Sequence, residues 1–126
     1  MAVKTALDAF IGQLEAAGFA ASVDPAELNP NPVAVWVQPR TVGSLTLGGT
    51  GTLTAWCYLV CGNFDTAQVL TLLDDALEGL LDMDAVSLSD DAAGTAAVDL
   101  AAAVLLPNMT APLPAYRVAV DLPFDL

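Results

Sequence analysis

The stretch LTAWCYLVCG, residues 53–62, is apolar on both faces if it forms a strand. Successive side chains of a strand point to opposite faces of a sheet. The two faces would carry Leu53, Ala55, Cys57, Leu59 and Cys61 on one side, and Thr54, Trp56, Tyr58 and Val60 on the other. A sheet face in contact with water normally alternates with polar residues, so this strand needs a cover on both faces. We expect the second cover to be a helix of the same chain or a neighbouring subunit.

The two cysteines of this strand raise the question of a metal or redox site. Cys57 and Cys61 lie four residues apart, which places their Cα atoms about 13 Å apart in a strand. A disulfide needs Cα atoms within about 7 Å. Zinc would need two further ligands, and the chain has no third cysteine and no histidine. We interpret both as buried structural residues and expect no metal and no cofactor.

Composition indicates one domain, residues 1–126, with apolar surface to spare. Hydrophobic residues make up 56% of the chain, and the mean hydropathy is +0.62. This is high for a soluble monomer, so we expect part of the surface to contact a partner. The longest apolar run, residues 100–107, is far shorter than the roughly 20 residues of a membrane span. Asp8 and Glu15 near the N-terminus differ from a signal peptide, which favours a soluble, cytoplasmic protein.

The charge balance excludes one large class of function. The chain has 15 acidic residues against three basic ones, for a net charge of −12. Nucleic-acid binding depends on lysine and arginine contacts to phosphate, so we expect no specific nucleic-acid binding. A negative wall repels phosphates and leaves DNA free to slide past it.

The order of predicted elements indicates an α+β fold. Apolar residues at helical spacing predict an N-terminal helix over residues 3–17, which Gly18 ends. Asp65 and Gln68 form a capping pattern for a second helix that runs to about residue 83. Alternation predicts strands at 19–23, 33–37, 41–51, 52–61, 83–89, 95–106 and 115–122, with one helical turn at 24–27, a reversal at 48–51 and a loop at 107–114. We expect one antiparallel or mixed β-sheet packed with two α-helices, the second inserted between strands.

The second helix has a leucine-rich side and an acidic side. Its predicted buried stripe consists of Val69, Leu70, Leu73, Ala76, Leu77, Leu80 and Leu81. The opposite side carries Asp74, Asp75, Glu78 and Asp82, with no basic residue at helical spacing. A solvated acidic face is the simplest interpretation, because nothing resembles a calcium-binding loop.

No pattern of catalytic residues is present. Serine and cysteine nucleophiles are usually activated by histidine, which the chain lacks. The grouped carboxylates lie on an exposed helix side without sign of a pocket that would shift their pKa. Neither GxGxxG nor GxxxxGK[ST] occurs. We expect the protein not to be an enzyme and assign no catalytic residue.

The layout of the chain resembles one known family. A proline-rich passage, PAELNPNP, leads into the valine strand VAVWV, and an extended hairpin and the capped helix DTAQVLTLLDDALEGLL follow before the closing strand LPAYRVAV. This arrangement resembles the small tail terminator (tail completion) proteins of long-tailed bacteriophages, particularly the alanine-rich acidic versions in phages of actinobacteria. The resemblance covers nearly the whole chain and is carried by layout and by the LPAYRVAV ending.

The resemblance implies a structural role in the virion. Such proteins form a ring of six copies at the head-proximal end of the tail, after assembly in the host cytoplasm. The ring stops polymerisation of the tube and joins the tail to the head, and DNA passes through its lumen. The implied partners are further copies of the chain, the tail tube protein and the head-tail connector protein, with no membrane.

Within that role, we predict which side chains make contacts. Trp36, Trp56, Tyr58 and Val60 are candidates for packing between subunits, although each tryptophan could instead belong to the core. The acidic residues Asp74, Asp75, Glu78 and Asp82 would face the lumen or solvent. Two alternatives remain: another connector or tube ring protein, and a small module that binds an apolar ligand in a cavity lined by the two-faced strand.

Overall fold

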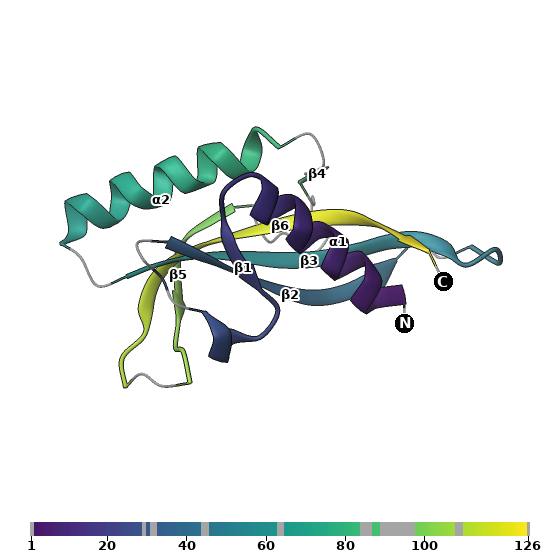
Figure 1. Cartoon of the computed structure of the whole chain (residues 1–126), viewed down its shortest axis with the longest axis horizontal. Helices are drawn as coiled ribbons and strands as arrows, with labels where there is room; N and C mark the ends of the chain where they lie inside the picture. Colours follow the sequence, from purple (N-terminus) through teal and green to yellow (C-terminus); the bar gives the residue numbers. More distant parts are fainter. Residues whose placement is uncertain are drawn as a thin grey trace.

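Two helices pack on the same face of a six-stranded mixed sheet (Figure 1). The computed structural model describes residues 2–28, 30, 33–43, 46–62, 65–83, 87–88, 98–107 and 110–125. Its elements are α1 (Ala2–Ala16), β1 (Ala20–Ser22), η1 (Pro25–Glu27), β2 (Val33–Gly43), β3 (Thr50–Cys61), α2 (Thr66–Leu81), β4 (Ser87–Leu88), β5 (Val98–Val104) and β6 (Leu113–Asp125). The strand order is β1-β2-β3-β6-β4, and β5 also pairs with β6. The predicted α+β class with two helices is confirmed.

Helix α1 ends where the sequence predicts. The Phe19 N–H donates to the Leu14 carbonyl at 3.0 Å, and the Gly18 N–H donates to the Glu15 carbonyl at 3.0 Å. This pair of bonds is the Schellman motif, which requires a left-handed residue, and Gly18 has φ 98°. The motif turns the chain back onto the sheet, so that β1 pairs in parallel with β2.

Strands β2 and β3 form one long hairpin whose tip projects beyond the rest of the sheet (Figure 1). The sequence predicts separate strands at 33–37 and 41–51, but β2 is continuous through Pro39. The pairing register shifts between Pro39 and Thr41, which leaves Arg40 as an unpaired bulge residue. Proline has no N–H to donate, and a bulge is one of the places where a sheet accepts it.

The reversal of this hairpin lies earlier than the predicted 48–51. The Gly49 N–H donates to the Thr46 carbonyl at 3.0 Å, and the Thr46 N–H donates to the Thr50 carbonyl at 2.8 Å. Gly49 has φ 87°, so this glycine closes the turn instead of opening it. Leu47, inside the turn, is fully exposed.

Helix α2 begins as predicted but buries a narrower stripe. The Asp65 carboxylate accepts from the Gln68 N–H at 2.9 Å and caps the helix. The buried residues of α2 are Val69, Leu73, Ala76 and Leu80. The predictions for Leu70 and Leu81 are wrong, since they are 50% and 43% exposed. Leu77 is partly buried and packs against the core, whereas Leu70 and Leu81 lie at the margins of the buried side.

The last strand of the chain occupies the interior of the sheet. β6 pairs with β3 along one edge and with β4 and β5 along the other. The predicted strand at 95–106 is confirmed over β5, whereas residues 95–97 lie outside the described residues. Of the strand predicted at 83–89, the structure describes β4, and 84–86 and 89 lie outside the described part. β6 begins at Leu113, before the predicted residue 115, because Leu113 pairs with Val104.

The main core lies between the sheet and the helices. Leu7, Phe10 and Leu14 of α1 pack with the buried stripe of α2 against the inward side chains of β2, β3 and β6. Cys57 and Cys61 are free thiols in this part of the structure, and their predicted burial is confirmed. No helix in the described ranges is long and apolar enough to cross a bilayer.

Candidate interaction surface on the second sheet face

The sheet face opposite the helices is covered at one end by the chain itself. Val60, Val104, Leu106, Leu113 and Ala115 form a second buried cluster, against which Leu28, Trp36, Tyr58 and Ala102 pack. The pairing of β5 with β6 is irregular between Asp99 and Ala102, and the strands bend away from α2 there (Figure 1). The cover of this end therefore consists of the bent β5–β6 hairpin and Leu28, the residue after η1. The expected cover, a helix of the same chain or a neighbouring subunit, is therefore wrong for this end of the face.

Val60 is fully buried in this second cluster. It packs inside its own chain and is not available on the surface. The other three predicted packing residues are only half-buried. All three lie on the same sheet face as Val60. Trp36 on β2 is paired directly with Tyr58 on β3, and Trp56 lies two residues before Tyr58, farther from the second cluster.

These three aromatic side chains contact one another. The rings of Trp36 and Tyr58 stack with centroids 4.9 Å apart and an interplanar angle of 24°. Trp56 meets Tyr58 edge to face, with centroids 6.3 Å apart. The Trp36 Nε1–H donates to the Val23 carbonyl at 3.2 Å, which fixes this indole against the segment that leads into η1.

Two arginines enclose the Trp56 ring. The guanidinium carbon of Arg40 lies 4.0 Å from the ring centroid, and that of Arg117 lies 4.1 Å from it. Arg40 is on β2 and Arg117 on β6, the two strands that flank β3, so the cations approach from opposite sides. Arg117 also forms an ion pair with Asp99 at 3.7 Å. We call Trp36, Arg40, Trp56, Tyr58 and Arg117 the aromatic–arginine patch.

The acidic residues of α2 lie on the other side of the sheet. Asp74, Asp75, Glu78 and Asp82 are all exposed. Asp74 accepts a hydrogen bond from the Tyr116 hydroxyl at 2.9 Å. Burial raises the pKa of Tyr116, and the hydrogen bond and negative charge of Asp74 raise it further. The structure does not bring this acidic side together with the aromatic–arginine patch.

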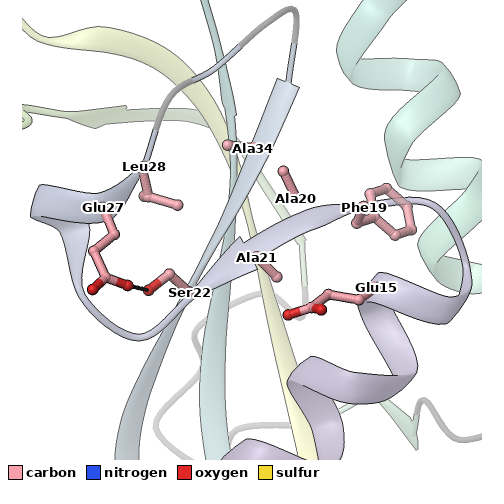
Figure 2. Close-up of a pocket in the computed structure, with 8 residues that line it drawn as sticks. All are labelled: Glu15, Phe19, Ala20, Ala21, Ser22, Glu27, Leu28 and Ala34. Atoms are coloured by element: carbon pink, nitrogen blue, oxygen red, sulfur yellow. Dashed lines mark hydrogen bonds between the residues drawn. The ribbon is translucent and has the colours of Figure 1, made fainter.

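Neither of two cavities in the described part of the chain is lined by a residue of the aromatic–arginine patch. One, of about 380 Å³, is lined by Glu15, Phe19, Ala20, Ala21, Ser22, Glu27, Leu28 and Ala34 (Figure 2). Figure 2 shows Ser22 and Glu27 turned toward each other, and the Ser22 hydroxyl donates to the Glu27 carboxylate at 3.2 Å. A second, of about 200 Å³, lies between α1 and the Leu122-Pro123 end of β6. Neither is lined by β3, so neither is the ligand cavity that the two-faced strand would form.

Sequence reasoning found the aromatic residues but missed the arginines. Arg40 and Arg117 are 77 positions apart in the chain and meet only through Trp56. Their contact depends on the bulge in β2 and on the pairing of β3 with β6, neither of which is visible locally. Among the residues that the structure describes, no group of three or more cysteine, histidine or carboxylate side chains is arranged to hold a metal ion.

Comparisons of this chain with models of protein families, with curated proteins and with solved structures found no match.

Proposed function

We propose that the protein is a structural subunit of a ring, of six copies, that caps the tail tube of a long-tailed bacteriophage. The ring ends tube polymerisation and joins the tail to the head connector, with DNA passing through the lumen. The proposal starts from the resemblance in chain layout. It assigns the protein no catalytic step and no cofactor.

The observation that carries the proposal is the unequal cover of the two sheet faces. Both helices pack on one face, and the other face carries half-buried aromatic rings in contact with two arginines. Tyrosine, tryptophan and arginine are enriched in protein–protein interfaces. A ring made by repeating one contact needs two different surfaces on each subunit. A sheet with helices on one side and an aromatic surface on the other supplies two such surfaces.

The net charge suits a channel for DNA. With 15 acidic residues against three basic ones, the subunit offers phosphates little attraction. A lumen with this charge repels the DNA backbone and does not retain it during passage. The tail tube protein and the connector protein would then bind the two ends of the ring.

Native mass spectrometry over a concentration series, with and without assembled phage tail tubes, tests this function. The expected result is a species near six times 12.9 kDa, or binding restricted to tube ends in electron micrographs. Incorporation along the tube would favour a tube protein, and a co-purifying small molecule would favour the ligand-binding alternative. A monomer that ignores tubes at every concentration would refute the proposal.

A further inference from the structure

Two of the three basic side chains of this chain lie together on one surface. Lys4 is already paired with Asp8, with 2.7 Å between its amine and the carboxylate. Arg40 and Arg117, the two other basic residues, both contact Trp56, and Arg117 also pairs with Asp99 at 3.7 Å, which leaves Arg40 as the exposed cation of the patch. In a chain of net charge −12, contacts between copies elsewhere bring like-charged surfaces together. The aromatic–arginine patch is the surface where a second acidic copy is attracted.

The best-matched acidic surface of that second copy is the outer side of α2. Asp75, Glu78 and Asp82 are exposed, and in the described part of the chain none forms an ion pair with the three basic residues. They recur at helical spacing on one side of α2 and span about 10 Å along the axis at 1.5 Å per residue. The two guanidinium carbons are no more than about 8 Å apart, since each lies about 4 Å from one centroid. The two guanidinium groups therefore fit within the length of the acidic row.

The patch and the acidic side of α2 cannot meet within one chain. Trp56 points away from the helices, because its neighbours Ala55 and Cys57 belong to the core between the sheet and α2. The acidic residues are on the far side of α2 from that core. Contact between the two surfaces therefore requires two copies.

We infer that the aromatic–arginine patch of one copy binds the Asp75, Glu78 and Asp82 side of α2 of the next copy. The inference rests on the proposed function and names the lateral contact of its ring. Such a contact joins two different surfaces, so each copy of a pair keeps its other surface free for a further neighbour. The arrangement closes into a ring if the rotation per copy allows it. Guanidinium–carboxylate bonds carry the recognition. The α2 acids then face a neighbour, in place of the predicted lumen or solvent.

Charge exchange tests the contact. Arg40→Glu and Glu78→Lys should each raise the dissociation constant between copies roughly tenfold or more, because each places like charges opposite one another. Lys4→Glu and Glu15→Lys make the same changes in charge on α1 and should assemble like the unchanged protein. Circular dichroism spectra verify that all four variants are folded.

Mixing the Arg40→Glu and Glu78→Lys variants gives the most specific result. The carboxylate introduced at position 40 of the first variant can then face the amine introduced at position 78 of the second. The unchanged Arg40 of the second variant faces the unchanged Glu78 of the first. Equimolar mixing should restore assembly, with equal numbers of the two variants in every closed oligomer counted by native mass spectrometry. Raising the salt concentration to about 1 M, where the Debye length is about 3 Å, should weaken assembly of the unchanged protein.

The outcomes separate this contact from the proposed function. If both variants assemble like their controls while the protein still caps tube ends, the contact is wrong and the function stands. If assembly depends on these charges and is restored by mixing, but tube ends are ignored, the contact stands and the function is wrong. A protein that stays monomeric in all conditions, including in the presence of tubes, overturns both the contact and the function.

Discussion

The two arginines around Trp56 should contribute unequally to folding stability. A cation over an aromatic ring is worth about 0.5–1 kcal/mol at an exposed site and about 2 kcal/mol or more when it is desolvated. The Arg117 side chain is 18% exposed, whereas Arg40 is an exposed bulge residue. We expect a coupling energy of about 0.5–1 kcal/mol for Arg40 with Trp56, and about 1.5–2 kcal/mol for Arg117 with Trp56.

Double-mutant cycles measure these two energies. Trp56→Leu removes the ring, and a methionine in place of either arginine keeps most of the apolar stem without the charge. Trp56→Leu alone should cost about 2–4 kcal/mol, because it removes both cation contacts and the edge-to-face contact with Tyr58. Urea unfolding followed by circular dichroism, at a concentration where the protein is monomeric, gives each free energy of unfolding. The cycle cancels the separate loss of the Arg117–Asp99 ion pair.

The order of the two coupling energies tests the role of exposure. If the coupling of Arg40 with Trp56 equals or exceeds that of Arg117, exposure does not set the strength of these contacts. If both lie within about 0.3 kcal/mol of zero, the error of such cycles, the contacts of the two arginines with Trp56 contribute nothing to stability.

Three further changes test separate parts of the fold. Burial raises the pKa of the Cys57 thiol to about 12, so a thiol reagent at about pH 8 should label it only in urea, and rapid labelling of the folded protein would contradict its burial. Tyr116→Phe should cost about 1 kcal/mol at about pH 7 through loss of the hydrogen bond to Asp74. Because the folded-state pKa of Tyr116 is raised, its contribution is complete below about pH 10 and is lost as pH rises through that pKa, so the unchanged protein should lose stability more steeply than the variant in alkali. Asp65→Ala should lower the free energy of unfolding by about 1 kcal/mol through loss of the helix cap. The control Asp82→Ala, at the C-terminal end of α2, should be neutral or slightly stabilising, because it removes a negative charge from the negative end of the helix dipole. Equal losses of stability in urea unfolding would refute the capping role.

Local signals in the sequence predict the ends of the helices well. The cap at Asp65 and the left-handed Gly18 act within a few residues of their own positions, so a reader of the sequence can locate them. Leu70 and Leu81 show the limit of this approach. Helical periodicity gives the direction of the apolar stripe, but its width depends on how much of the sheet lies beneath the helix.

The candidate site was only half predictable for a related reason. Trp56 and Tyr58 stand out because they occupy the second face of a strand whose first face is already apolar. The position of Arg40 follows from a bulge, and that of Arg117 from pairing between distant strands. The pairing of β5 with β6 likewise brings Val104 and Leu113 next to Val60, so the cover of that residue is a tertiary result.

The position of β6 inside the sheet has a consequence for how the chain is made. β6 is the last of the six strands to leave the ribosome, yet β3 pairs with it along its whole length, up to Thr50 with Asp125. Until then the hairpin of β2 and β3 has an open apolar edge, which can pair with other chains and aggregate. Pairing across such long separations is slow, because the loop must close before any contact forms. The sheet can therefore be completed only after β6 has left the ribosome.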